Sequence, residues 1–520
     1  MFARIETVSF QGVEVTPIDV QVQISPGLPN FIIVGLADKA VGESKERVRA
    51  ALNALALALP SKRITVNLAP ADVQKEGTHY DLPIAVGLLV SMGVIPQDAI
   101  EGLVALGELG LDGAIAPVSG ALPAAIYASS VGKGLICPEA CGGEAAWAGD
   151  LNIIAPNHLL SLINHFKGTQ VLSAPEAILE DDSKEIHLDM RDIKGQETAK
   201  RALEVAAAGG HHMLMWGPPG SGKSMLASRL SSILPPLTPE EALEVTMIHS
   251  LAGQLSEGRL LRTRPFRDPH HSATMPALIG GGIKAGPGEI SLAHHGVLFL
   301  DELPEFARST LEALRQPVES GRAVVSRANA HYVYPARIQL MAAMNPCRCG
   351  YLSDPERSCS RAPKCALDYQ SRISGPLFDR IDIHIDVPEV KAQDLHQPAT
   401  GETSETIRAR VIHARNIQKA RFESEGSEIS LNAHAEGQLL EKIVNLSLED
   451  RTFLETASER FKLSARGYAR VLRVARTIAD LANSKTIQKE HLGEALSYRM
   501  MTYGGGTSAT SSPRSVQYNR

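Results

Sequence analysis

The segment 212–224, HMLMWGPPGSGKS, decides the fold of the central part of this chain. Its first five residues predict a buried strand, and GPPGSGKS matches the phosphate-binding pattern G-x-x-x-x-G-K-[ST], which joins a strand to a helix. The glycines let backbone N–H groups turn towards phosphates, and the start of the following helix favours negative charge. An accidental glycine-rich turn is the alternative, and the preceding strand argues against it. The predicted nucleotide loop comprises Gly217, Pro218, Pro219, Gly220, Ser221, Gly222, Lys223 and Ser224.

Polar residues with suitable chemistry follow further strands. Lys223 is expected to reach the β- and γ-phosphates of ATP, and the Ser224 hydroxyl to bind Mg²⁺. VLFLDE (297–302) is an apolar strand ending in Asp301, which suits the Mg²⁺ shell, and Glu302, which suits activation of the attacking water. Such an acidic pair alone is usually a solvated strand end, but together with the loop it indicates catalysis. Asn345, after QLMAAM, is placed to orient that water, although a strand-end asparagine is more often a turn residue.

The composition is that of a soluble protein with several domains. The chain has 520 residues, 44% of them hydrophobic and 21% charged, which excludes a disordered scaffold. The net charge of −6 argues against coating of nucleic acid through bulk charge. The start lacks an apolar leader, and the longest apolar stretch, 82–96, is shorter than the ~20 residues of a membrane helix. We therefore expect a cytoplasmic protein without membrane contact.

The strand and helix patterns predict a multidomain α/β protein. The expected α+β domain covers residues 1–168, a polar linker covers 169–189, and a parallel-sheet core covers 190–400. An almost purely helical domain is expected over 401–502, followed by a flexible tail at 503–520.

Four of the six cysteines lie close together, with the spacing C-x-C-x₉-C-x₅-C. Four thiolates in one short insertion (347–365) can close a tetrahedron around a structural Zn²⁺. Free or redox-active cysteines and an iron–sulfur cluster are the alternatives. Cys137 and Cys141 are expected to be unliganded thiols. The predicted zinc ligands are Cys347, Cys349, Cys359 and Cys365.

The chain resembles the YifB/ComM family of magnesium-chelatase-like AAA+ ATPases over nearly its whole length. The resemblance is carried by GPPGSGKS, RPFRDPHHSAT, PGEISLAHHG, GVLFLDE, MAAMNP, GPLFDRID and SARGYARVLR, and by the N-terminal segments VGLADKAVGESKERVRAAL and ITVNLAPADVQKEGTHYDLPIAVGLL. It implies ATP and Mg²⁺ as ligands, a homo-hexameric ring and nucleotide at the subunit interfaces. The member ComM is tied to natural transformation, in which it acts as an ATP-driven DNA branch-migration helicase.

The resemblance also implies roles for single residues. Asn345 corresponds to sensor 1, Arg380 to an arginine finger that acts on the neighbouring subunit, and Arg466 to the sensor-2 arginine. Arg372 and Arg473 lie close enough in sequence to compete for the last two roles. A surface salt bridge is the alternative for each arginine.

The N-terminal domain resembles the proteolytic domain of Lon. The Lon domain needs a serine nucleophile and a lysine, and here His79 and Leu122 stand where these residues would fall. Peptide hydrolysis is therefore not expected, and the fold class becomes an inactive Lon-like domain, an AAA+ core with a zinc-binding insertion and a helical lid.

Several basic residues lie before and after the segment VLFLDE (297–302) in the sequence. In related ring helicases, insertions in these places line the pore and hold the backbone of a nucleic-acid strand, a contact that needs only positive charge and flexible backbone. A solvated charged face is the alternative, and His270 and His271 could equally be packed. The DNA-contact candidates are Arg264, Arg267, Lys284, Arg322 and Arg327, the last two in a predicted hairpin.

Three functions remain open on this basis. The first is a ComM-type motor on single-stranded or branched DNA, with recombination proteins as possible partners. The second is a protein-remodelling ATPase that binds polypeptide with its Lon-like domain. The third, a subunit that inserts Mg²⁺ into a porphyrin, needs neither the Lon-like domain nor the cysteine insertion.

Overall fold

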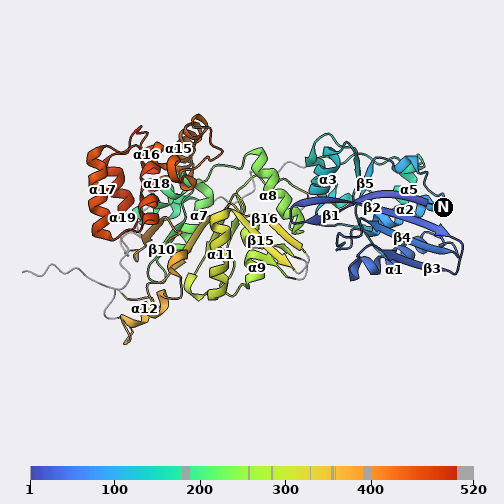
Figure 1. The fold of residues 1–520 in the computed structure, drawn as a ribbon, viewed down its shortest axis with the longest axis horizontal. Helices are drawn as coiled ribbons and strands as arrows, with labels where there is room; N and C mark the ends of the chain where they lie inside the picture. Colours follow the sequence, from blue (N-terminus) through green and yellow to red (C-terminus); the bar gives the residue numbers. More distant parts are fainter. Residues whose placement is uncertain are drawn as a thin grey trace, which may run out of the picture.

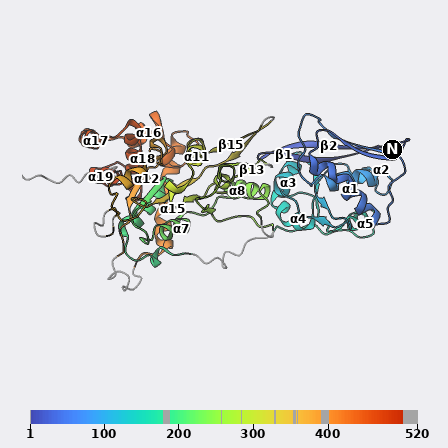
Figure 2. The ribbon, with the colours of Figure 1, turned by 90° about the horizontal axis from the view of Figure 1, so that it is seen from below.

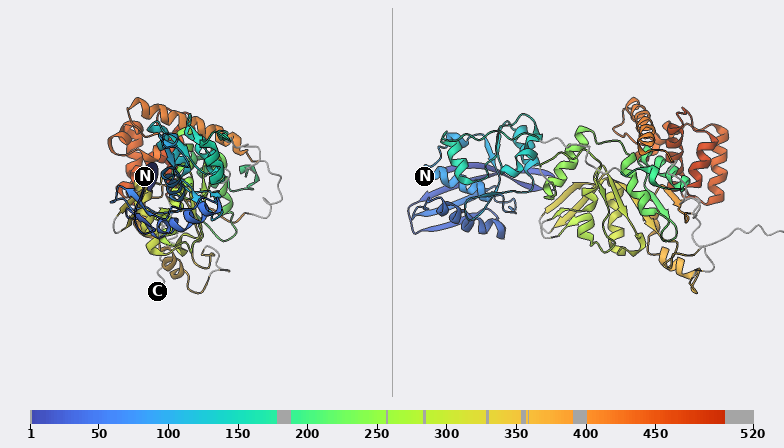
Figure 3. Two further views of the ribbon diagram at one scale, coloured as in Figure 1. Left: turned by 90° about the vertical axis from the view of Figure 1, so that its right-hand side faces the viewer. Right: turned by 180° about the vertical axis from the view of Figure 1, so that it is seen from behind.

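The computed structural model shows an elongated molecule with its parts in a row (Figures 1 and 2). The N-terminal part lies at one end, the nucleotide-binding sheet in the middle and the C-terminal helices at the other end, an order also seen from behind in Figure 3. The structure describes residues 2–177, 188–255, 258–282, 285–327, 330–352, 357, 359–390 and 401–499. Residues 178–187 of the expected linker and the whole expected C-terminal tail lie outside these ranges.

The N-terminal part is built on a seven-stranded mixed sheet with the order β3-β4-β2-β1-β5-β8-β9. The long strands β1 and β2 pair antiparallel, and Ile18, Val20 and Val22 alternate with more exposed residues along β2. One sheet face therefore packs against helices α1 and α2, while the other packs against α3 and α4. The strands are β1 (Phe2–Gln11), β2 (Glu14–Ser25), β3 (Asn30–Val34), β4 (Arg63–Ala69), β5 (Leu103–Ala105), β8 (Gly134–Ile136) and β9 (Ile153–Ile154), and a small ribbon is formed by β6 (Glu108–Leu109) and β7 (Ile115–Ala116).

The helices of this part match the apolar segments of the sequence. They are α1 (Lys39–Ala54), α2 (Asp81–Ser91), α3 (Ala121–Ser130), α4 (Glu139–Ala145) and α5 (Leu159–Phe166). Helix α1 ends at Ala54, although apolar residues continue to Leu59. Ala56 has a φ of 57°, a left-handed conformation that stops a helix.

The central part confirms the predicted parallel sheet. Its strand order is β11-β14-β17-β10-β18, and every pairing between neighbours is parallel. Both faces are covered, which explains why the strands read as continuous apolar runs. The strands are β10 (Met213–Trp216), β11 (Phe266–Arg267), β14 (Val297–Leu300), β17 (Gln339–Met344) and β18 (Ile383–Asp386).

Different elements cover the two faces of this sheet. One face packs on α6 (Glu197–Gly209), α7 (Lys223–Ile233) and the C-terminal helices in a single apolar core. The other face packs on α9 (Met275–Ile279), α10 (Glu289–Leu292), α11 (Arg308–Ser320) and the hairpin of β15 (Arg322–Arg327) with β16 (Ala330–Pro335). The antiparallel register of β15 and β16 confirms the predicted hairpin. The remaining elements are α8 (Pro239–Leu251), β12 (Gly280–Gly281), β13 (Gly286–Pro287), α12 (Lys364–Gln370) and α13 (Gly375–Phe378).

The C-terminal part is helical, as expected. Its helices are α15 (Ser404–Ser424), α16 (Gly437–Val444), α17 (Leu448–Phe461), α18 (Ala465–Leu481) and α19 (Lys489–Ser497). A buried ionic network joins them: the Asp480 carboxylate, fully buried, accepts hydrogen bonds from Arg476 (2.8 Å), Arg421 (3.1 Å) and Asn432 (2.9 Å). Within the described residues, no helix is both long and apolar enough to cross a membrane.

The N-terminal part docks on the central part through α8. The buried Glu144 of α4 accepts hydrogen bonds from the Leu122 N–H (2.9 Å) and from the Ser250 hydroxyl at the end of α8. Burial raises the pKa of Glu144. The Trp147 indole also donates to the Gly258 carbonyl (3.3 Å), and the β1–β2 turn at Gly12 lies against β16. Contacts at the end of α8, at Gly258 and at β16 therefore hold the two parts together.

Candidate nucleotide-hydrolysis site

The predicted polar residues meet at one edge of the central sheet. The phosphate-binding loop follows β10, Asp301 and Glu302 follow β14, and Asn345 follows β17. These three strands are neighbours and parallel, so their carboxyl ends lie side by side. In open α/β sheets, ligands bind in this position.

The loop has the conformation that its glycines make possible. Gly220 and Gly222 have φ values of 76° and 91°, which favour glycine, and a Cβ on Gly217 would lie 2.1 Å from the Val387 carbonyl oxygen. Lys223 begins helix α7, and its ammonium group donates to the carbonyls of Gly217 (2.9 Å) and Pro218 (2.8 Å). Burial lowers the pKa of Lys223. The lysine thus lies inside the loop, where phosphates of a nucleotide would take over its hydrogen bonds.

The chemistry of the oxygen ligands fits Mg²⁺. The Ser224 hydroxyl donates to Asp301 Oδ2 at 2.6 Å, which places a hydroxyl and a carboxylate together beside the loop. Burial and the charge of Asp301 raise the pKa of Asp268. Hard oxygen ligands of this kind, completed by water and phosphate, are what Mg²⁺ prefers.

Glu302 has a partner that the sequence did not reveal. Its backbone is in a left-handed conformation (φ 50°), and its carboxylate lies 3.3 Å from Nδ1 of His271. His271 comes from the segment after β11, the strand beside β14. The motif RPFRDPHHSAT therefore reaches the catalytic edge, and only the pairing of β11 with β14 reveals this.

Asn345 joins the same cluster. Its Oδ1 accepts a hydrogen bond from the Lys223 ammonium group at 3.3 Å. The loop lysine, the strand-end amide and the acidic pair therefore form one continuous group of side chains. A nucleotide γ-phosphate bound by Lys223 would lie within reach of both Asn345 and Glu302.

Comparison with known proteins shows the family of the chain. Three family descriptions match consecutive stretches: "Subunit ChlI of Mg-chelatase" over residues 20–141, "Magnesium chelatase, subunit ChlI" over 189–395 and "Magnesium chelatase, subunit ChlI C-terminal" over 401–499. The chain is 44% identical to the uncharacterized protein YifB of Salmonella typhimurium, covering 96% of this chain and 97% of that protein. It is 43% identical to the competence protein ComM of Haemophilus influenzae, covering 94% and 96%.

The chain belongs to the YifB/ComM family of magnesium-chelatase-like AAA+ proteins. Similarity to the magnesium-chelatase 38 kDa subunit of Rhodobacter capsulatus is more limited, with 29% identity over 30% of this chain and 49% of that protein.

The arginines that the YifB/ComM resemblance singles out lie in two places. Arg372 is bound to Glu305 (3.0 Å) and the Pro304 carbonyl (3.2 Å), close to the acidic pair of its own subunit. Arg380 precedes β18, which runs parallel to β10, so it lies at the amino edge of the sheet. Arg466 is exposed at the start of α18 and contributes with Arg380 to lowering the pKa of Glu319.

Arg473 is committed to the packing of the helical part. Its Nε donates to the Ala435 carbonyl (2.7 Å), and its Nη2 pairs with Glu436 (3.1 Å), while the side chain is 10% exposed. This geometry gives it a structural role between α18 and the segment before α16.

The cysteine insertion brings its thiols together next to the loop. Cys347 Sγ and Cys349 Sγ are 3.0 Å apart, and Cys365 joins them within 4.8 Å. Cys359 packs against the same cluster. In a tetrahedral Zn–S₄ site with Zn–S bonds of roughly 2.3 Å, sulfurs lie about 3.8 Å apart, and the three grouped thiols lie near this spacing and offer donor atoms of the kind that zinc takes. A hydrogen bond with Cys347 lowers the pKa of the Cys349 thiol, which favours a thiolate ligand. Gly350 in turn lies against Pro219 of the phosphate-binding loop.

The predicted DNA-contact residues differ in how available their side chains are to a phosphate. Arg264, 9% exposed, donates to the Pro235 (2.7 Å) and His295 (2.6 Å) carbonyls and pairs with Glu241 (2.7 Å), so it holds α8 and is not available to a phosphate. Arg267 pairs with Glu289 (2.6 Å) and is 28% exposed. Arg322 is exposed at the start of the hairpin. Lys284 and the side chain of Arg327 lie outside the described residues.

The residues in place of the Lon dyad are buried. His79 is 7% exposed, its ring nitrogen lies 2.9 Å from the Val8 carbonyl oxygen, and burial lowers its pKa. Leu122 is fully buried at the start of α3. Neither residue offers a nucleophile or a base to a substrate.

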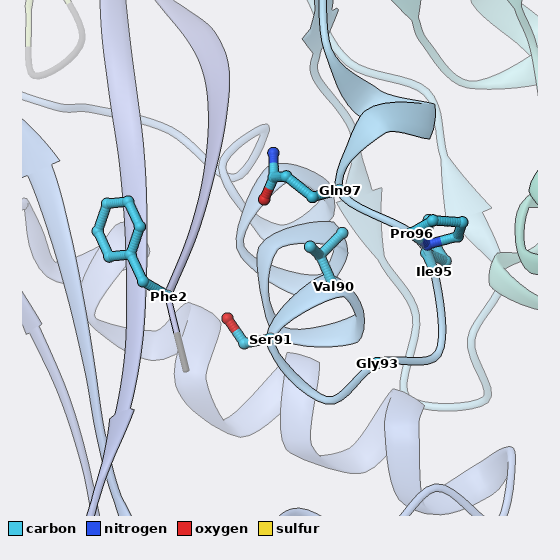
Figure 4. A pocket seen from close by; sticks show the side chains of 7 residues that line it. All are labelled: Phe2, Val90, Ser91, Gly93, Ile95, Pro96 and Gln97. Atoms are coloured by element: carbon cyan, nitrogen blue, oxygen red, sulfur yellow. The ribbon is translucent and has the colours of Figure 1, made fainter.

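A shallow pocket lies far from the catalytic edge (Figure 4). It is formed where β1 begins and α2 ends, at the far end of the N-terminal part, and no charged side chain lines it. Its lining residues are Phe2, Val90, Ser91, Gly93, Ile95, Pro96 and Gln97.

Proposed function

We propose that this protein is an ATP hydrolase of the ComM type, a hexameric motor that drives branch migration of DNA during recombination of incoming DNA. The observation that carries the hydrolase activity is the convergence of Lys223, Ser224, Asp301, Glu302 and Asn345 at neighbouring strand ends. The 43% identity to the competence protein ComM over nearly the whole chain supports the link to DNA.

Each residue has a defined task in ATP hydrolysis. Lys223 and the loop N–H groups bind the β- and γ-phosphates, and Ser224 and Asp301 hold Mg²⁺, which when bound neutralises phosphate charge. Glu302 accepts the proton of the attacking water, and Asn345 orients that water. The contact between His271 and Glu302 has to loosen before the carboxylate can face the water.

Arg380 serves the neighbouring subunit in this proposal. The phosphate-binding loop follows the carboxyl end of β10, whereas Arg380 precedes the amino end of the parallel strand β18. A four-residue strand spans roughly 13 Å, so Arg380 faces away from the nucleotide of its own chain. Hydrolysis then depends on a ring in which Arg380 and the nearby Arg466 meet the next subunit's ATP.

The hairpin β15–β16 is the part of the central domain best suited to hold DNA. One of its faces packs into the core through Ala323, Val325 and Tyr332, and the other exposes Arg322. An exposed arginine on such a ribbon can bind a phosphate without reading bases. The buried His79 and Leu122 support a Lon-like N-terminal domain without peptidase activity.

The ATP turnover of the full-length protein tests this function. We expect the rate to rise strongly with single-stranded DNA and most with a four-way junction, and the stimulation to fall steeply with salt because phosphate contacts release counterions. Arg322→Ala should weaken the stimulation. Acceleration by an unfolded polypeptide but not by DNA would instead indicate a protein-remodelling ATPase.

The cysteine insertion is expected to hold one structural Zn²⁺ per chain. Metal analysis should find about one zinc per purified chain, and Cys359→Ser should lose it, because three ligands do not close a structural tetrahedral site. Cys141→Ala is the matched control, since this buried thiol lies in the N-terminal part. Purified protein that is folded and active without zinc would refute the assignment.

A further inference from the structure

The Arg380 side chain is folded against its own subunit. Its Nη2 forms an ion pair with the Glu319 carboxylate, and its Nη1 donates to the Pro376 carbonyl at 2.8 Å. Only 11% of the side chain is exposed, and the buried Nε has no hydrogen-bond partner among the described residues. In this conformation the guanidinium group does not extend towards another subunit.

Glu319 lies directly before the hairpin. It belongs to the last turn of α11, which ends at Ser320, and Gly321 adopts a left-handed conformation (φ 66°). Strand β15 begins at Arg322, whose carbonyl accepts a hydrogen bond from the Ser320 hydroxyl at 3.1 Å. A displacement of β15 therefore reaches Glu319 through only two intervening residues.

The ion pair is easy to break. The Arg380 side chain is 11% exposed but Glu319 is 61% exposed, so water reaches the carboxylate and screens the pair from that side. By contrast, helix α11, which carries Glu319, and helix α13, which ends two residues before Arg380, are fixed, since Leu311 and Leu314 of α11 share one core with Leu377 and Phe378 of α13. A small tilt of the end of α11 can separate the charges without unfolding either helix.

We propose that Glu319 is a positioning residue that withholds Arg380 from the neighbouring ATP site until DNA bound to the hairpin β15–β16 moves the end of α11. This inference rests on the proposed function. It gives the hairpin a second task, because contact with a DNA phosphate at Arg322 also releases the arginine that the next subunit needs. A γ-phosphate then replaces the Glu319 carboxylate as the anionic partner of Arg380.

The ATP turnover of Glu319→Gln, without and with a four-way junction, tests the proposal. We expect the DNA-free kcat to rise about two- to fivefold, the effect of losing one exposed ion pair, with KM for ATP unchanged. The rate with DNA should stay the same, so the stimulation ratio should fall by the same factor. Glu319→Asp keeps the charge and should keep a low DNA-free rate.

Two further variants separate this effect from a structural one. Glu423→Gln removes a carboxylate of matching exposure (62%) that pairs with Lys419 on α15, and it should leave both rates unchanged. In the double variant Glu319→Gln/Arg380→Ala, the rise should disappear, because Glu319 acts only through Arg380.

The outcomes distinguish this inference from the proposed function. Loss of turnover in Arg380→Ala together with unchanged rates in Glu319→Gln would overturn the role of Glu319 alone. Full turnover in Arg380→Ala would overturn the trans-acting role of Arg380 and the inference with it.

Discussion

Replacing Glu302 by glutamine should leave ATP binding intact and lower kcat by about 10²–10⁴-fold, the usual contribution of a general base. Glutamine has nearly the same shape as glutamate, so the β14 end and the Mg²⁺ ligands Ser224 and Asp301 stay in place. It cannot accept the proton of the attacking water, however. Turnover at saturating ATP and the affinity for a fluorescent ATP analogue measure the two effects separately.

Two comparisons make this prediction specific. Lys223→Ala should instead abolish nucleotide binding, because it removes the ammonium group that lies inside the loop where the phosphates would bind. Glu455→Gln, an exposed carboxylate on α17, should keep both binding and turnover. Normal hydrolysis by Glu302→Gln would assign the general base to another residue.

Asp480→Ala should destabilise the helical part by about 3–5 kcal/mol, the effect of breaking a buried ion pair. The fully buried carboxylate accepts hydrogen bonds from Arg421, Arg476 and Asn432. Arg476 is 2% exposed, so without Asp480 its charge would be left uncompensated in the core between α15 and α18. The midpoint of the first transition in urea measures the loss.

The matched control is a surface pair in the same part of the protein. Glu425 and Lys442 are 3.1 Å apart with side chains 34% and 65% exposed, so Glu425→Ala should cost less than about 1 kcal/mol. Equal losses for the two variants would show that the Asp480 network contributes no more than a surface contact.

The parts of the candidate site that lie within local motifs could be predicted from the sequence. The loop after β10 and the acids after β14 follow from strand, loop and helix patterns, because each motif contains its own structural context. The sequence also placed Asn345 at a strand end, but its contact with Lys223 is known only from the parallel pairing of β10 with β17.

Contacts between distant segments could not be predicted in this way. The approach of His271 to Glu302 depends on β11 lying next to β14, and the binding of Arg264 to Glu241 depends on where α8 packs. A run of arginines in the sequence does not indicate which of them is buried and hydrogen-bonded within the protein. The end of α1 at Ala54 depends on a left-handed turn that the apolar pattern does not encode.

Because the N-terminal part docks on α8 at one of its ends, a rotation at this contact would displace its far end the most. Helix α8 follows the phosphate-binding helix α7 after a short connection, and Glu144 fixes its far end to α4. The ten-residue strand β1 leads away from this contact towards Phe2 and spans roughly 34 Å (Figure 1). A rotation of about 10° at this contact would therefore carry the Phe2 end through about 6 Å.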